Sequence, residues 1–410
     1  PPLIVSVAFA AVLLVFAPQL AGIFLHSVGR QGTACIRVLA LFLPLATALT
    51  LLLAAIRGFG KMLPFVAVQH VVVPGLRPLL VIAVISAGLG SVAVAVAWAL
   101  PLAIGAAVAA VILVRHTVPG AESSEPEAAG SRRALGWEFW RFSAPRALAG
   151  FFQVAMLWFD VLLVGALVST RDAGIYAATN RYIIAGSMAL SALDVVTGPR
   201  ISRLLAAHRT GEAQALFRAG TWWLMALSWP VYLTLGVFAS FFMRLFGPGF
   251  EAGSMPLLIL SIAMLVNMAT GNNKTVLLMG GGSGLNLLFS AFALAINVSL
   301  NLVLIPAIGI IGAAIAWSAS IAAENVLTAV AVWRRLGLNP FGVGYSVVTG
   351  AALVCFGGTG LVVRSALGAS AGPFLLFGLM ATASYAIGLW RFRQVLHLPV
   401  FTALLKVRLR

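Results

Sequence analysis

The feature that most constrains this chain is a series of uncharged apolar stretches. A helix rises 1.5 Å per residue, so about 20 apolar residues span the ~30 Å hydrocarbon core of a bilayer. Only 9% of the 410 residues are charged and 61% are hydrophobic, whereas soluble domains carry about 25% charged residues. These figures exclude an ordinary soluble enzyme and predict a polytopic membrane protein.

Backbone hydrogen bonding decides which kind of membrane protein this is. In lipid every backbone polar group needs an internal partner, which leaves only helices or a closed barrel. The period-two alternation of barrel strands is absent from the chain. We therefore expect an all-α polytopic membrane protein with about twelve transmembrane helices. The predicted spans are 3–24, 35–56, 64–86, 90–114, 143–168, 172–198, 219–243, 254–279, 284–305, 309–333, 345–366 and 372–390.

The net charge of +16 follows the pattern of membrane topology. Cytoplasmic loops of membrane proteins carry an excess of lysine and arginine. If the 199–218 loop is cytoplasmic, alternation puts 18 of the 26 Lys and Arg residues on that side, 5 on the other and 3 inside spans. We therefore expect a multi-pass protein of the cytoplasmic (inner) membrane with both termini in the cytoplasm. The basic charge then requires no nucleic-acid partner.

Cysteines and histidines give no sign of a metal site or an enzyme. Cys35 and Cys355 lie in or beside apolar stretches, so no disulfide framework is indicated. The five histidines show no ligand spacing. No Ser-His-Asp, Cys-His or paired-carboxylate arrangement occurs outside the spans. We expect a protein that is not an enzyme and has no metal and no cofactor.

One polar stretch divides the chain. Residues 118–133, VPGAESSEPEAAGSRR, are rich in Pro, Gly, Ser and Glu, a composition typical of flexible linkers. We expect a cytoplasmic linker over 116–140. It would separate an N-terminal lobe of four helices (1–115) from a C-terminal lobe of six (141–335). Residues 336–410 would add two helices and a basic cytoplasmic tail.

The two lobes are related by an internal repeat. FAPQLAGIF at 16–24 parallels FASFFMRLF at 238–246, and AGLGSVAVA at 87–95 parallels IGIIGAAIA at 308–316. The offsets are nearly constant, but the first copy lacks counterparts of 141–222, which is two spans. Two equal copies would give two pseudo-symmetric lobes of six helices plus a C-terminal helix pair. Such parallel repeats hold a transport site at their interface.

Several segments of the second copy resemble a known family. In order they are FSAPRALAGFFQVAMLWFDVLLVGALVSTRDAGIYAATNRY, GPRIS, RLFGPGFEAG, LLMGGGSGLN, NVSLNLVLIPAIGIIGAAIAWS and LGLNPF. This series resembles the polysaccharide-biosynthesis flippases of the O-antigen type. They belong to the multidrug/oligosaccharidyl-lipid/polysaccharide exporter superfamily. The resemblance covers 141–342, and 1–115 through the repeat. The family normally has fourteen helices, so this sequence departs from it by lacking the first two.

Basic residues inside the spans are candidate substrate-binding groups, because an intramembrane ionisable residue is costly unless it lines a polar site. Arg181 and Arg77 lie deep in their spans, and Arg77 stands between two prolines. Asn180 precedes Arg181 and adds polar atoms. Arg146 and Lys274 are nearer the cytoplasmic ends, where cavity lining and snorkelling to the surface are both open.

The acidic residues Asp160 and Glu324 are candidates for coupling or ion pairing. Asp160 needs a partner, and two roles are open: an ion pair with Arg181 on the next helix, or a protonatable coupling site. Glu324 has no obvious cation in the sequence. Asn297 and Asn301, one helical turn apart, are expected to hydrogen-bond neighbouring helices.

The resemblance implies transport of a polyprenyl-pyrophosphate-linked oligosaccharide by alternating access, for export of a cell-surface polysaccharide. The deep arginines suit a pyrophosphate through charge-assisted hydrogen bonds. Implied partners are the lipid-linked oligosaccharide and membrane lipids, with glycan polymerase and glycosyltransferases as candidates. Two alternatives stay open: a cation-coupled multidrug exporter of the same superfamily, and a non-transporting membrane scaffold for glycan assembly.

The C-terminal stretch LWRFRQVLHLPVFTALLKVRLR, 389–410, is predicted to lie along the cytoplasmic membrane surface. It interleaves apolar residues with five basic ones, and each basic residue near anionic lipid contributes ~1 kcal/mol. A cysteine introduced by Arg408→Cys should therefore react with an impermeant maleimide only from the cytoplasmic side. Labelling from outside intact cells would contradict this topology.

Overall fold

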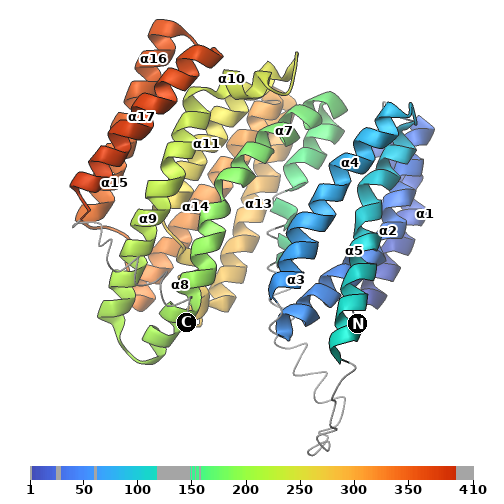
Figure 1. Cartoon of the computed structure of the whole chain (residues 1–410), viewed down its shortest axis with the longest axis horizontal. Helices are drawn as coiled ribbons and strands as arrows, with labels where there is room; N and C mark the ends of the chain where they lie inside the picture. The colour runs from blue at the N-terminus through green and yellow to red at the C-terminus, as the bar shows by residue number, and fades with distance from the viewer. Residues whose placement is uncertain are drawn as a thin grey trace, which may run out of the picture. The chain divides into compact units, whose positions relative to one another are not determined.

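The computed structural model describes residues 2–24, 29–59, 62–117 and 148–393, the last range without 149, 153 and 157. Within these residues every regular element is helical, which confirms the all-α prediction (Figure 1). Nine helices in this part of the chain are long and apolar enough to cross a membrane, and the bent pair Gly150–Met156 with Trp158–Leu167 makes ten. The predicted linker core at 118–133, Arg146 and the tail beyond 393 lie outside the described residues.

The chain divides into two compact units, Pro1–Leu135 and Gly136–Arg410. Unit 1 is an antiparallel helical bundle in which α2 packs against both α1 and α5. Its small core joins Leu49 and Leu53 of α2 to Ala106 and Ala109 of α5. Its helices are α1 (Pro2–Phe24), α2 (Gly29–Gly58), α3 (Met62–Val66), a π-helical turn (Ala67–Val72), α4 (Val73–Ser86) and α5 (Ser91–Thr117).

The helix that carries Arg77 is continuous, although the sequence suggested a break there. α4 runs through Pro74 and Pro78, and the irregularity lies one turn earlier, in the π-helical turn 67–72. A proline lacks the N–H that would bond the carbonyl four residues back. The wider turn just before Pro74 accommodates this missing hydrogen bond, because π-turns insert one extra residue into an otherwise continuous helix.

Unit 2 contains most of the described helices. After the bent pair come α7 (Thr170–Gly186), α8 (Met188–Ala206), α9 (Thr210–Val237), α10 (Ala239–Arg244), a 3₁₀ turn (Phe250–Gly253), α11 (Ser254–Ala269), α12 (Asn273–Met279), α13 (Ser283–Ile308) and α14 (Ile310–Leu336). The C-terminal pair follows as α15 (Val343–Ala352), a π-helical turn (Leu353–Gly358), α16 (Thr359–Leu367) and α17 (Ala371–Arg391).

α9 is the helix around which unit 2 is assembled. It packs against α8, α11 and α15, and it buries large side chains such as Phe217, Met225 and Tyr232. At 28 residues it is ~42 Å long, which is enough to cross a bilayer. α9 is not one of the nine helices counted above as membrane-spanning, because its sequence is more polar than theirs. The predicted span 219–243 therefore begins nine residues too late and continues past the end of α9.

The C-terminal helices pack against α9 and α10, as their neighbouring ribbons suggest (Figure 1). Trp222 and Tyr385 each donate one hydrogen bond across this contact, to Pro340 O and Ala226 O, both at 3.1 Å. At the opposite end Arg364 donates to Val237 O, a carbonyl left free at the end of α9. The helix pair therefore packs as part of unit 2.

One predicted span, 172–198, is two helices. α7 ends at Gly186 and α8 begins at Met188. Tyr232 of α9 donates from its hydroxyl to Ile183 O at 3.0 Å, and the Ser187 N–H turns instead to Ile184 O at 3.1 Å. Gly186 allows this contact, because a Cβ there would collide with the Tyr232 ring. The Tyr232 hydroxyl thus occupies the Ile183 carbonyl, which would have accepted the Ser187 N–H in a continuous helix.

Gly312 should be intolerant of substitution. It brings the start of α14 against the end of α13, and a Cβ at this position would collide with the backbone of Leu304 and Ile305. Backbone atoms cannot move aside as a side chain does. Gly312→Ala should therefore lower the free energy of unfolding by about 1–3 kcal/mol, as overpacking usually does. The thermal unfolding midpoint in detergent measures this loss. Gly284→Ala, where a Cβ meets nothing within 4 Å, is the matched control and should leave the midpoint unchanged.

Candidate functional site

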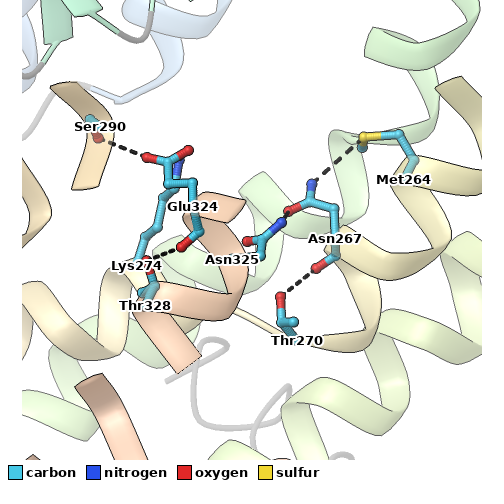
Figure 2. Close-up of polar contacts among 8 residues, drawn as sticks. All are labelled: Met264, Asn267, Thr270, Lys274, Ser290, Glu324, Asn325 and Thr328. Carbon is cyan, nitrogen blue, oxygen red and sulfur yellow. Dashed lines mark hydrogen bonds and ion pairs between the residues drawn. The ribbon is translucent and has the colours of Figure 1, made fainter. Parts of the chain in front are cut away.

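Two groups of polar side chains surround the buried carboxylates of unit 2. The Asp160 group comprises Asp160, Tyr176, Asn297 and Asn301. The Glu324 group comprises Lys274, Ser290, Glu324 and Thr328, with Asn267 and Asn325 beside it (Figure 2). Both groups consist of residues from three or more helices, so tertiary packing assembles each of them. Buried polar atoms of this kind are expensive in lipid unless they are paired or functional.

Asp160 is held by neutral donors. Its side chain is 1% exposed. Asn301 donates to Oδ1 at 2.7 Å, and the Tyr176 hydroxyl donates to Oδ2 at 3.2 Å. The Asn301 amide also donates to Asn297 Oδ1 at 3.1 Å. The expectation that these asparagines bond a neighbouring helix is confirmed for Asn301.

The ion pair between Asp160 and Arg181 that the sequence left open is not formed. The Arg181 guanidinium lies over the Trp158 ring, 5.8 Å from its centroid. The reason is helical phase: Arg181 is five residues after Tyr176, which turns it about 140° away from the face that meets Asp160. Asn180, four residues after Tyr176, is on nearly the same face as Tyr176 and is half-buried.

Arg77 of unit 1 has similar surroundings. Its guanidinium lies 5.0 Å from the centroid of the Trp98 ring on α5. Its Nε is buried and has no hydrogen-bond partner among the described residues. Both deep arginines of the described chain therefore rest on an indole face. Such a contact orients a guanidinium and leaves its in-plane N–H groups available to a ligand.

Lys274 and Glu324 form an ion pair, which supplies the cation that the sequence analysis did not find for Glu324. Lys274 Nζ lies 2.7 Å from Glu324 Oε2, and the two side chains are 31% and 2% exposed. Ser290 of α13 donates to Glu324 Oε1 at 2.8 Å (Figure 2). This pair could not be predicted from local sequence because its members are fifty residues apart. Lys274 therefore does not simply extend to the surface.

The residue next to Glu324 makes a second contact with the same span. Asn325 donates to Asn267 Oδ1 at 2.9 Å, and Thr270 donates to the Asn267 carbonyl at 2.8 Å. Asn267 precedes the interruption between α11 and α12, whereas Lys274 follows it. Consecutive residues of α14 thus hold both sides of this interruption, as Figure 2 shows.

The two buried carboxylates differ in their neighbours. Asp160 faces neutral donors, whereas Glu324 faces an ammonium group and a hydroxyl. In the described residues no three His, Cys, Asp or Glu side chains converge as a metal site would require. Carboxylates in such positions are suited to exchanging a proton or a counter-charge during a conformational change.

Sequence comparison finds a distant relative. No family model matches the chain. The chain is 25% identical over 193 residues to the probable low-salt glycan biosynthesis flippase Agl15 of Haloferax volcanii. The match covers 46% of this chain and only 40% of the length of that relative.

Structural comparison gives a broader match. The chain is similar to the lipid II flippase MurJ in an inward closed conformation, with a TM-score of 0.70 and 10% identity over 96% of this chain and 82% of that one. It is also similar to a multidrug resistance MATE family transporter of the MOP superfamily, with a TM-score of 0.60 and 14% identity over 82% and 77% of the two chains. The chain has the fold of MOP superfamily transporters, as the sequence resemblance implied.

Loss of the Asp160 carboxylate should destabilise unit 2. Asp160→Ala would leave the Tyr176 hydroxyl and the Asn301 amide buried without their acceptor, and each such loss costs about 1–3 kcal/mol. Asp160→Asn keeps an oxygen in place and should cost less. The thermal midpoint in detergent ranks the two variants. Glu212→Ala, which removes an exposed ion pair, is the control and should shift the midpoint little. Equal loss in both Asp160 variants would contradict this account.

Proposed function

We propose that this chain, whose fold is that of the MOP superfamily transporters, acts as a flippase for a polyprenyl-pyrophosphate-linked oligosaccharide. The observation that carries the proposal is the imbalance between the charged side chains within the spans. The acids Asp160 and Glu324 are occupied by protein donors, and among the described residues neither Arg77 nor Arg181 pairs with a carboxylate. The charge that is not paired within the described protein, and is therefore available to a ligand, is positive.

A pyrophosphate suits this arrangement chemically. Arginine presents planar N–H donors that match phosphate oxygens in pairs. The Trp158 ring under Arg181 and the Trp98 ring under Arg77 cover one face of each guanidinium, so the edge donors remain for the ligand. Asn180, beside Arg181, is proposed to add a neutral contact. Arg146 is proposed to meet the head group nearer the cytoplasmic side, whereas Lys274 is already paired with Glu324.

Alternating access would complete the cycle. Parallel-repeat transporters work by rocking of one repeat against the other, and the same kind of cycle is proposed for this chain. The polar head group would cross the bilayer while the lipid tail stays in it. Asp160 is proposed to change its charge state during this cycle. Both termini would be cytoplasmic in the inner membrane, and glycosyltransferases and a glycan polymerase would supply and consume the glycan.

A cation-coupled multidrug exporter is the second candidate. It is favoured by the similarity to a MATE family transporter and by Asp160, a buried acid that accepts hydrogen bonds from the neutral side chains of Tyr176 and Asn301. Substrate charge separates the two functions. Liposomes containing the purified chain should move a fluorescent polyprenyl-pyrophosphate glycan and leave a cationic dye untransported. Transport of the dye alone would favour the exporter.

Arg181 provides the sharpest genetic test. Arg181→Ala should abolish complementation of a flippase-deficient strain while expression and insertion stay normal, since an apolar residue inserts more easily. Arg181→Lys should complement in part, because the charge survives but the paired donors are lost. Arg209→Ala, at an exposed ion pair, is the matched control and should complement fully.

The same assay tests a purely structural role. If Arg181 served only to neutralise Asp160, the double variant Arg181→Ala with Asp160→Ala would recover activity. Because Asp160 has other partners, we expect no recovery. Restored growth in the double variant would overturn the recognition role of Arg181.

A further inference from the structure

The span formed by residues 250–279 is built with an interruption. α11 ends at Ala269 and α12 begins at Asn273. Gly271 between them has φ +68°, in the left-handed region that favours glycine. A Cβ there would also collide with Thr221 of α9. Any other side chain at Gly271 would therefore be strained in this conformation. Irregular backbone at membrane depth is tolerated only inside protein or along a cavity.

The two halves of this span are anchored very unequally. α11 has 16 residues and places Leu257, Leu260, Met264 and Met268 in the main core of unit 2. α12 has 7 residues and contributes Val276 and Leu277 to a small separate cluster. Segments with few buried apolar contacts open more readily than the rest of a fold. α12 is therefore the half of the span with fewer buried apolar side chains.

Glycine turns flank α12 on both sides. Gly271 precedes it, and Gly280, Gly281 and Gly282 follow it, with φ +79° at Gly281. Glycine tolerates large changes of backbone angle at little steric cost. A short helix between two such turns therefore has conformationally permissive residues at both ends.

Side-chain contacts oppose such a rotation. Lys274 of α12 pairs with Glu324 of α14, which also accepts a hydrogen bond from Ser290 of α13. Asn272, just before α12, donates to Thr197 Oγ1 of α8 at 2.7 Å. The ion pair is the only one recorded among the described residues of α12, and separating its charges in a medium of low dielectric is unfavourable. We therefore expect the Lys274–Glu324 ion pair to be either fully formed or fully separated.

We propose that α12 is a hinged gate within unit 2, and that the Lys274–Glu324 ion pair is the latch that holds it closed against α13 and α14. Gly271 and the 280–282 turn are the hinges. Lys274 can leave because its side chain is partly exposed, whereas the buried Glu324 keeps the hydrogen bond from Ser290. Asn267 and Asn325 keep α11 in place when the gate opens. This gate does not depend on which cargo the chain carries.

Cysteine accessibility tests the latch without any transport assay. The full chain would carry Val276→Cys in a background with Cys35→Ala and Cys355→Ala, purified in detergent and treated with a water-soluble maleimide. Val276 is fully buried, so labelling reports opening of α12. The neutral double variant Lys274→Met with Glu324→Gln should raise the labelling rate about tenfold or more, since the rate follows the open population.

Two further variants test how much each contact of Glu324 contributes to keeping α12 closed. The charge swap Lys274→Glu with Glu324→Lys rebuilds the pair in reverse and should return the rate toward that of the parent chain. Ser290→Ala leaves the pair and removes one hydrogen bond, so it should give a smaller rise. Because Ser290→Ala changes no charge, it keeps the test valid if the swap fails to fold.

A buried control separates a local gate from general loosening. Ala293→Cys on α13 is equally buried and lies outside α12, so its labelling should stay slow in every variant. An unchanged rate at position 276 in the neutral double variant would overturn the latch. An equal rise at 276 and 293 would overturn the gate. Neither result depends on whether the chain flips a glycan, so the proposed function is tested separately.

Discussion

A polar group inside hydrocarbon has no water to bond, so it must find its partner within the protein. This requirement explains where the helices of unit 2 end, bend and meet. The hydroxyl of Tyr232 takes the carbonyl of Ile183, and α7 ends there. The carbonyl at the end of α9 is bonded by Arg364 of the C-terminal pair. Asn325 and Glu324 bond the two halves of a broken span. Each of these helix ends and breaks coincides with a tertiary hydrogen bond or ion pair.

The same requirement separates the charged side chains within the spans into two classes. The acids are occupied by donors of the protein: neutral ones at Asp160, and Lys274 with Ser290 at Glu324. The deep arginines lie on indole rings instead. A ring neutralises no charge, so the guanidinium still favours an anion. This difference links the packing of the helices to the proposed recognition of a pyrophosphate, and it sets Lys274 apart as a group with a structural partner.

Several features of the site could be predicted from local sequence. The depth of Arg77, Arg181, Asp160 and Glu324 follows from counting residues along apolar runs. The spacing of Asn297 and Asn301 predicted a contact with another helix, which Asn301 makes with Asp160. The pairing of charges could not be predicted. Lys274 and Glu324 are distant in sequence, and the Asp160–Arg181 pair, plausible by proximity, fails because helical phase turns Arg181 elsewhere.

The sequence by itself determined that the chain is an all-helical membrane protein, because apolar length and low charge leave lipid as its only stable surroundings. It also determined most span positions, since each span is a local property of about 20 residues. Only the tertiary structure decided where helices break and which charges pair. Gly271 ends a helix through its contact with Thr221, and Gly186 through its contact with Tyr232. Both depend on neighbours brought close by folding, which no local pattern encodes.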